Sequence, residues 1–399
     1  MADDVFMTTT QDRLPEFEFE HLAEMPDPYP QYAEWRRGGA LIKGGPRQWG
    51  VTRHADVSSL LKDRRVAHAM PRSYTDFVSG PGATSEFRQN SLLMQDGAGH
   101  QRLRRLMAQA FTPSLVAGLR DSVERLVDAM IEPLLDGEVG DIVDLLAFPL
   151  PATVICELLA IRGADRDGVR TMSAKLFGTD RAASDENVVW LRACIDAALD
   201  DRRPDPDGDL LQRMLAAGEG EDALTRQEIV DNAVLLFFAG FETTSHLIAS
   251  GCVALTRFPN QRDRLWGDPG LARAAVEEFL RFDGAVRSVP CATIEPMVVG
   301  GRTIREGSVL HLLLGSANHD DAAFTEPGRL DISRRPNDHV SFGGGPHRCL
   351  GMHLARLEGD VVFSRLALRL AALEAAGAPE NRIGSFAGYA RVPVRARPT

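Results

Sequence analysis

The sequence predicts a mainly helical protein with a small β region, and three observations carry this prediction. Apolar residues recur with helical spacing along most of the chain, over the longest distance from Thr225 to Arg257. Short apolar stretches bounded by glycine turns, which favour strands, are concentrated at residues 41–52 and 287–313. The glycine-rich stretch Phe342-Gly343-Gly344-Gly345-Pro346-His347-Arg348-Cys349-Leu350-Gly351 leads directly into an amphipathic run from Met352 to Leu370, which predicts a helix.

Composition and charge are those of a globular protein and exclude other classes. The 399 residues are 44% hydrophobic and 25% charged, which is ordinary for a soluble protein and sufficient for a large core. The formal net charge of −11 argues against nucleic-acid binding. No linker or repeat divides the sequence, so we expect one domain over residues 1–399, with a loose arm at residues 1–25.

Cysteine usage and the N-terminus predict a cytoplasmic protein. The five cysteines are scattered and form no metal-type pair, as expected in a reducing compartment. Residues 1–15 show no signal peptide. No run approaches the roughly 20 apolar residues that span a bilayer, so we expect no membrane association.

The N-terminal elements follow from short patterns and from residues that break them. The spacing predicts a helix over Gln31 to Arg37, strands at Leu41 to Ile42 and Gln48 to Thr52, and a helix over His54 to Lys62. From Ala67 to Leu93 prolines and glycines interrupt every pattern, which favours a long loop of functional importance.

A helix is predicted from Asp96 onward, and it carries a basic cluster. His100 and Arg104 are four residues apart and share one face of this helix, whereas Arg102 and Arg105 point elsewhere. Taken alone, the segment would be a solvated basic face. Helical periodicity continues over residues 114–136, 151–162, 166–177, 187–201 and 207–217, with a polar loop at residues 202–208.

The long apolar helix from Thr225 to Arg257 contains an unusual segment, Ala239-Gly240-Phe241-Glu242-Thr243-Thr244. The helix start is marked by Thr225 with Glu228 three residues later, which is the capping-box pattern. A glycine in the middle of a helix costs about 1 kcal/mol against alanine, and an acid beside two threonines is unusual in an apolar helix. Taken alone, the segment would be a bent core helix whose threonines bond back to carbonyls.

The C-terminal half adds one more helix and short strands. Leu271 to Phe282 is predicted to be helical, with Glu278 and Arg281 three residues apart on one face, a spacing that alone usually marks a surface pair. The remaining patterns predict β elements, namely strands over Arg287 to Leu313 with turns at Gly300-Gly301 and Glu306-Gly307, and a hairpin over Phe386 to Val394.

Cys349 lies where a cysteine can become a thiolate. Unpaired N–H groups and the dipole at the start of the following helix favour negative charge on its sulfur. Gly343, Gly344 and Gly345 allow the backbone to approach a flat or bulky group. The loop therefore suits a thiolate held against a metal macrocycle, although a lone Gly-x-Gly would more often be a turn with a buried cysteine.

These motifs occur in order from about Asp27 to Val394, and together they resemble the cytochrome P-450 family of haem-thiolate monooxygenases. The resemblance implies the cytochrome P-450 fold, haem b (iron protoporphyrin IX) as the cofactor and Cys349 as the axial iron ligand. A thiolate in that position favours O–O cleavage. The resemblance also implies that Glu278 and Arg281 form a buried structural pair rather than a catalytic one.

The resemblance further implies roles for the other site residues. In the family, the positions that match His100 and Arg104 bind the haem propionates, and further cofactor contacts are implied for His347, Phe342, Gly343, Gly351 and Ala239. Gly240 would leave room for oxygen, Thr243 would organise water at the bound dioxygen, and Glu242 would help to deliver protons.

One position departs from the family pattern. After the Glu-x-x-Arg helix the family usually has an arginine that binds a haem propionate, and by our count this position is Cys291. A cysteine supplies neither charge nor a good donor. The resemblance leaves Arg287 and His347 as candidates for that role.

The resemblance implies a monooxygenase that inserts one oxygen atom of O₂ into a C–H bond or double bond of an apolar or polyketide-like molecule in secondary metabolism. The substrate, free or tethered to a carrier protein, would be covered by residues 67–93, 165–205 and 386–394. The sequence shows no flavin or ferredoxin segment. We therefore expect a monomer that receives electrons from a separate ferredoxin and an NAD(P)H-dependent ferredoxin reductase.

Two alternatives stay open. One is a haem-thiolate enzyme with another outcome, such as aryl coupling, dehydration or a peroxide-driven reaction, and the Glu242–Thr243 pair argues against it. The other is a haem gas sensor, which would need a signalling module that the sequence does not show.

Overall fold

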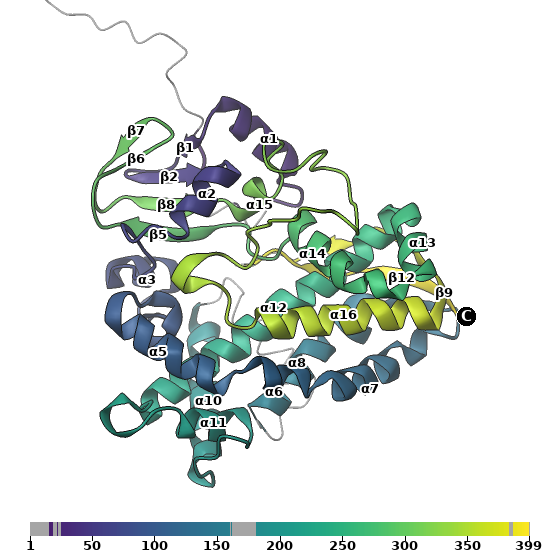
Figure 1. Cartoon of the computed structure of the whole chain (residues 1–399), viewed down its shortest axis with the longest axis horizontal. Helices are drawn as coiled ribbons and strands as arrows, with labels where there is room; N and C mark the ends of the chain where they lie inside the picture. Colours follow the sequence, from purple (N-terminus) through teal and green to yellow (C-terminus); the bar gives the residue numbers. More distant parts are fainter. Residues whose placement is uncertain are drawn as a thin grey trace, which may run out of the picture.

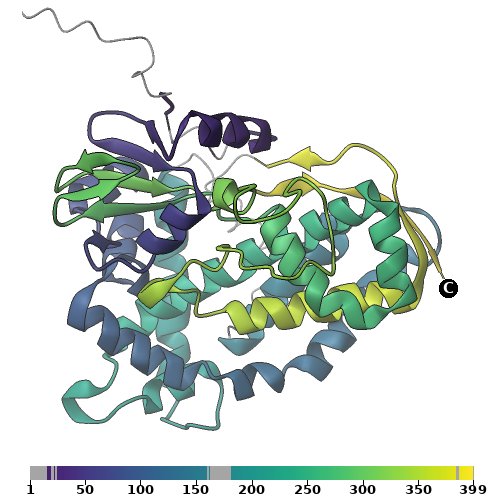
Figure 2. The same cartoon turned by 45° about the horizontal axis from the view of Figure 1, so that its top comes forward.

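The computed structural model describes residues 16–18, 22, 25–159, 161, 181–382 and 386–398. Helices form most of this part of the chain, as predicted, and the larger group of strands lies along one side (Figure 1). In Figure 2 the strands near the N-terminus again lie beside the helical part, not within it.

The helical part is organised around α12 (Arg226–Arg257), which is buried over most of its length. Thr225 and Glu228 form the predicted capping box, because each backbone N–H donates to the other residue's side-chain oxygen, over 2.8 Å and 3.2 Å. In the described part of the chain α12 alone is long and apolar enough to cross a bilayer, but 72% of that window is buried inside the fold. This degree of burial is typical of a core helix in a globular protein.

The other helices surround α12 and share one hydrophobic core with it. Those packed directly against it include α8 (Pro149–Leu158), α10 (Arg181–Asp200), α11 (Leu210–Ala216), α13 (Pro259–Gly267), α14 (Ala272–Phe282) and α16 (Met352–Arg369). Farther out lie α5 (Gly97–Ala110), α6 (Pro113–Ala117) and α7 (Arg120–Ile131). Among the short turns, η3 (Leu92–Met94) and η5 (Val143–Ala147) also contact α12, and the others are η4 (Glu132–Leu134), η6 (Gly220–Asp222), η7 (Pro269–Leu271) and η8 (Gly345–His347). The predicted helix at residues 166–177 lies outside the described residues.

A five-stranded sheet forms the core of the β region. Its strand order is β1 (Leu41–Lys43), β2 (Gln48–Val51), β8 (Val309–Leu312), β5 (Val289–Thr293) and β3 (Val66–Ala67). Only β2 and β8 run parallel; the other neighbours are antiparallel. Three short helices accompany it, namely α1 (Tyr29–Gly38), α2 (His54–Leu60) and α15 (Leu314–Ala317). The pairing of Ala67 with Ala292 brings the segment after β3 beside Cys291.

The described residues form three smaller sheets as well, and one of them corrects a prediction. The predicted turn at Gly300-Gly301 joins β6 (Met297–Val299) to β7 (Arg302–Ile304). The C-terminal hairpin predicted over Phe386 to Val394 has the wrong bounds, because β11 (Tyr389–Arg391) pairs with the preceding strand β10 (Glu380–Asn381). Residues beyond it form β12 (Pro393–Pro398), which lies between β4 (Val139–Asp141) and β9 (Leu370–Ala375).

The long loop predicted from Ala67 to Leu93 is also wrong. This segment folds into α3 (Arg72–Ser79) and α4 (Ala83–Asn90), separated by a turn at Gly80, whose φ is +81°. The buried faces of both helices consist largely of hydroxyl residues, namely Thr75, Ser79, Thr84 and Ser85. In α3 the apolar Phe77 and Val78 follow helical spacing but are exposed. Each helix is only eight residues long and follows a proline or glycine, so the sequence pattern favours a loop.

The described residues of the N-terminal arm are packed, which corrects the expectation of a loose arm for them. The Phe17 N–H donates to the Lys43 carbonyl over 3.0 Å, and the Phe17 ring lies 4.8 Å from the Trp35 ring. Leu22 is only 3% exposed. These residues therefore form part of a small core at the outer edge of the sheet, with Tyr32 and Ile42.

Candidate active site

The cysteine loop, residues 342–351, is shaped by two glycines that no other residue could replace without strain. Gly343 and Gly345 have φ values of +65° and +60°, in the left-handed region. A side chain at Gly345 would bring its Cβ within 2.5 Å of the Leu61 carbonyl oxygen. The loop therefore lies tightly against the end of α2.

The sulfur of Cys349 is surrounded by groups that favour a thiolate. Burial raises the pKa of this thiol, but hydrogen bonds from the backbone N–H groups of Gly351 and Met352 act in the opposite direction, as does the charge of Arg104. The Cys349 N–H donates to the Phe342 carbonyl over 2.9 Å, which closes the loop. The prediction that Cys349 lies at the start of the following helix is confirmed, since α16 begins three residues later.

Arg356 on α16 is a further cation beside the loop that the sequence did not single out. Its guanidinium lies over the Phe342 ring, 4.6 Å from the centroid. It also donates to both carboxylate oxygens of Glu277, over 2.6 Å and 2.8 Å. Arg356 is thereby held in place, and its charge also lowers the pKa of Cys349.

His100, Arg104 and His347 are brought together at one side of the loop. The rings of His100 and His347 stack with centroids 4.0 Å apart, and Arg104 Nη2 donates to the Arg348 carbonyl over 2.6 Å. Arg102 and Arg105 turn away, as predicted, toward Glu228 at 2.8 Å and Asp222 at 2.6 Å.

His100 has an unsatisfied polar atom. It is 2% exposed, and its Nε2 has no hydrogen-bond partner among the described residues. Buried polar atoms are normally paired, so this nitrogen, next to a cation, fits an anionic group that binds there. The cluster therefore suits the carboxylates of a bound cofactor.

The Ala239–Thr244 segment of α12 faces open space on one side. Ala239 is exposed and Gly240 and Thr243 are half-buried, although most of the helix is buried. The Thr243 hydroxyl donates to the Ala239 carbonyl over 2.9 Å, the back-bond that the sequence suggests. A small molecule at this position would meet one hydroxyl and a stretch of helix without bulky side chains.

Glu242 has a different environment from its neighbour Thr243. Its side chain is 1% exposed and forms a bidentate ion pair with Arg382, which follows β10. The sequence gives no signal for this pair, because Arg382 is an isolated arginine 140 residues away along the chain. In this structure Arg382 is a bidentate partner of the predicted acid, and the Thr243 hydroxyl donates to the Ala239 carbonyl instead.

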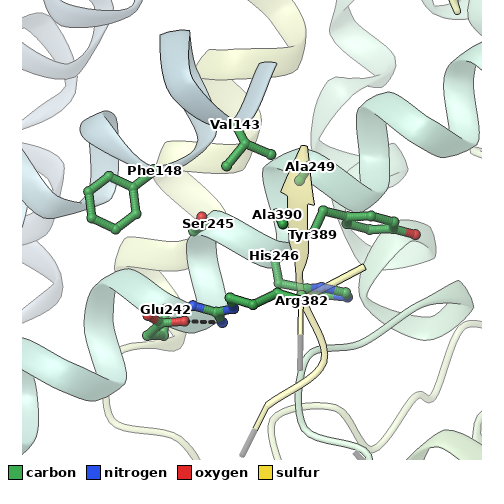
Figure 3. Close-up of a pocket in the computed structure, with 10 residues that line it drawn as sticks. Val143, Phe148, Glu242, Ser245, His246, Ala249, Arg382, Tyr389 and Ala390 are labelled. Atoms are coloured by element: carbon green, nitrogen blue, oxygen red, sulfur yellow. Dashed lines mark hydrogen bonds and ion pairs between the residues drawn. The ribbon is translucent and has the colours of Figure 1, made fainter. Parts of the chain in front are cut away.

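Glu242 and Arg382 line a cavity of about 200 Å³ beside α12 (Figure 3). His246 and Tyr389 also line this cavity, and their rings stack with centroids 5.7 Å apart. His246 Nε2 lies 2.9 Å from the Asp283 carbonyl. Burial alone would raise the pKa of Asp283, but the charge of His246 and a hydrogen bond from Tyr29 outweigh it and hold this pKa well below its usual range.

The Glu278–Arg281 pair is buried and structural, as predicted. Both side chains are inaccessible to solvent and join through two hydrogen bonds of 2.8 Å. Arg334, in the segment that leads to the cysteine loop, donates to Glu278 over 3.1 Å. The pair therefore anchors that segment to α14.

Comparison with known proteins gives consistent matches over most of the chain. A family model described as "Cytochrome P450" matches residues 270–380. The vitamin D(3) 25-hydroxylase of Pseudonocardia autotrophica is 37% identical over 354 residues, which cover 85% of either chain. The mycinamicin VIII C21 methyl hydroxylase of Micromonospora griseorubida is 35% identical over 355 residues, 88% of this chain and 91% of the relative.

Solved structures agree with the sequence relatives. P450BioI, in complex with an acyl carrier protein that bears hexadec-9Z-enoic acid, superposes with a TM-score of 0.85 at 30% identity, over 93% of this chain and 99% of that one. The similarity extends through both the helical part and the sheet, so it concerns the whole fold.

Proposed function

Because the chain belongs to the cytochrome P450 family and is a P450 monooxygenase, we propose that it binds haem b with Cys349 as the axial ligand. We propose further that it inserts one oxygen atom of O₂ into a C–H bond or double bond of an apolar or polyketide-like molecule in secondary metabolism. The observation that carries this proposal is the environment of the Cys349 sulfur. It accepts hydrogen bonds from two backbone N–H groups at the start of α16, in a loop shaped by two glycines with positive φ.

The residues of the site fit a haem. Arg104, His100 and His347 would bind its propionates, and the unpaired Nε2 of His100 is the group that most directly requires an acceptor. Gly343, Gly351 and Phe342 would line the cysteine side, and a side chain at Gly351 would meet nothing within 4 Å. When bound, haem with a thiolate ligand supplies the activation of O₂.

The α12 segment would work on the other side. Ala239 is exposed and carries only a methyl group, and Gly240, where a Cβ would meet Ile155 at 3.4 Å, keeps the helix slim for bound oxygen. Thr243 presents a hydroxyl that can exchange its back-bond to Ala239 for a hydrogen bond to water. Glu242 would supply protons from the Arg382 side of the helix, since a carboxyl group held in an ion pair can change partners.

The substrate class and partners rest on relatives. Two of them are named for hydroxylation of vitamin D(3) and of mycinamicin VIII, and a third binds an acyl chain on a carrier protein. This supports an apolar or polyketide-like substrate, free or tethered. Electrons would come from a ferredoxin and its NAD(P)H-dependent reductase. All five cysteines are free, which supports a reducing cytoplasm.

The test begins with a binding-spectrum screen of polyketides, terpenes and small aromatic acids. A compound that shifts the haem spectrum is then turned over with ferredoxin, reductase and NAD(P)H under ¹⁸O₂. We expect a product with one ¹⁸O atom. A product without ¹⁸O would instead favour coupling or dehydration, and turnover with peroxide alone would favour a peroxide-driven reaction.

A further inference from the structure

Cys291 occupies a buried position on β5 beside the proposed propionate site. Its side chain has no charge, and it is fully buried. The sequence left Arg287 and His347 as candidates to supply the missing donor. The Nη1 of Arg287 points to the N-terminal segment, where it donates to the Met25 carbonyl over 2.6 Å and to the Leu22 carbonyl over 3.3 Å, and its buried Nε has no partner among the described residues.

His68 is the side chain that lies next to Cys291. It directly follows β3, whose pairing with β5 places His68 Nε2 3.8 Å from the Cys291 sulfur. A thiol is a weak hydrogen-bonding partner, so this nitrogen lacks a strong one. Since the two residues are 223 positions apart, only the fold brings them together.

His68 also extends the histidine cluster of the site. Its ring stacks on His347 with centroids 3.8 Å apart and planes at 19°, and His347 stacks in turn on His100. The three imidazoles thus form one column, which we call the histidine stack (His68, His347, His100). The stack lies beside Arg104, and its middle ring is that of His347, which belongs to the cysteine loop.

The protonation states of the side chains in the stack make it a donor site for anions. Burial lowers the pKa of His68 and of His100 to about 4, so each is a neutral imidazole with one N–H to donate near pH 7. The acid within the cluster, Asp96, is already engaged, since one oxygen accepts the Ala69 N–H at 2.6 Å and the other lies 3.0 Å from His347 Nε2.

Neither a metal site nor simple aromatic packing accounts for the stack as well as an anion site does. A metal site would need nitrogen lone pairs that converge, whereas these rings meet face to face, and no group of three or more metal-ligating side chains occurs in the described residues. Simple aromatic packing would not leave His100 Nε2 without a partner.

We propose that His68 binds a haem propionate in place of the arginine that Cys291 lacks, so that the histidine stack and Arg104 together hold both carboxylates. This inference rests on the proposed function. Haem has two carboxylates, and buried anions need several donors or a cation. Arg104, His100 and His347 supply one set of donors, and His68 supplies the second.

The test measures haem transfer from the holoprotein to apomyoglobin. His68→Phe keeps an aromatic ring in the stack but removes the N–H, and we expect it to lose haem roughly 10- to 100-fold faster than wild type, because a hydrogen bond to a charged group is worth one to two decades. The matched control is His311→Phe, since His311 is also 9% exposed and lies on β8 of the same sheet. The control should lose haem at the wild-type rate.

A second arm separates a propionate contact from a general packing effect. In proteins reconstituted with haem dimethyl ester, whose propionates carry no charge, His68→Phe should lose its cofactor no more than about 3-fold faster than wild type, well below the charge-assisted difference. In the His68→Phe background, Cys291→Arg should slow the loss of ordinary haem. If His68→Phe does not fold, His68→Leu, which also has no hydrogen-bond donor, takes its place, with loss faster than wild type for haem only.

The outcomes distinguish the two proposals. If the wild-type protein binds no haem, or gives no thiolate-type spectrum, the proposed function fails. If it does bind haem in this way, and the His68 variants lose it at the rate of wild type and of His311→Phe, only the His68 assignment is overturned. Faster loss of both haem and its ester would assign His68 to packing and would also overturn the inference.

Discussion

The Glu242 carboxylate and the Arg382 guanidinium form a bidentate ion pair between the middle of α12 and the residue that follows β10 (Figure 3). The carboxylate is 1% exposed and the guanidinium side chain 27%. The pair therefore couples the position of the proposed proton donor to the C-terminal hairpin.

Removing one member of this pair should destabilise the protein. Arg382→Gln removes a bidentate countercharge from a buried carboxylate, so we expect the free energy of unfolding in urea to fall by about 2 kcal/mol or more. Arg391→Gln on the same hairpin is the control, because Arg391 and Glu380 form an exposed pair, whose loss should cost about 0–1 kcal/mol. Adding Glu242→Gln to Arg382→Gln should restore part of the stability. Equal effects of the two single variants would show that the buried pair is not coupled.

Thr243 should control how electrons are used. In Thr243→Ala the hydroxyl that can order water is absent, so oxygen should still be reduced but should leave as peroxide. The measurement is product formed per NAD(P)H consumed, which should fall several-fold. The neighbouring Thr244→Ala, at a buried position, serves as the control and should keep wild-type coupling. A Thr243→Ala enzyme with unchanged coupling would assign Thr243 to the helix alone.

Reduction by ferredoxin should depend on salt. Arg348 in the cysteine loop and Lys62, beside Gly344, are exposed cations on one face, whereas Arg102 and Arg105 are paired with acids and contribute little net charge. An acidic ferredoxin would be attracted to this face. The rate of first-electron transfer should fall as ionic strength rises from about 0.01 to 0.15 M, since the Debye length shrinks from about 30 to 8 Å.

Arg348→Gln should lower the rate at low salt and flatten this dependence. The exposed Arg397→Gln on β12 should leave both unchanged. A rate that does not change with salt in the wild-type protein would argue against electrostatic docking at the cysteine loop.

Glu358 on α16 should make stability depend on pH. Burial raises the pKa of this carboxyl to about 8, and its Oε2 has no partner in the described part of the chain. Because the folded pKa lies above the unfolded one, the stability is fully present below about pH 4.3 and declines as pH rises toward 8. Glu358→Gln should therefore gain stability over wild type, by up to a few kcal/mol, between pH 5 and 8. A difference that is constant over this range would show that Glu358 is not protonated in the fold.

Short sequence patterns were sufficient to predict most of the fold and part of the site. The capping box at Thr225, the glycines of the cysteine loop and the His100–Arg104 spacing each depend on a few consecutive residues, and the structure places them as predicted. The helices α3 and α4 were not predicted, because hydroxyl groups rather than apolar side chains form most of their buried faces. The single-domain organisation stays a prediction.

The missed site residues depend on contacts between distant segments. His68 acquires its role only when β3 pairs with β5, and Arg382 only when β10 approaches α12. Neither residue lies in a motif, and both would pass as ordinary loop residues in the sequence.

The carbon monoxide spectrum of the reduced protein tests the central claim, that Cys349 is the thiolate ligand of a haem, most directly. Wild type should show the absorption band that gives the family its name, and Cys349→His should bind haem but lose that band together with turnover. A histidine-ligated sensor would lack the band in wild type. A Cys349→His variant that keeps both the band and turnover, or a wild-type protein without the band, would contradict this account.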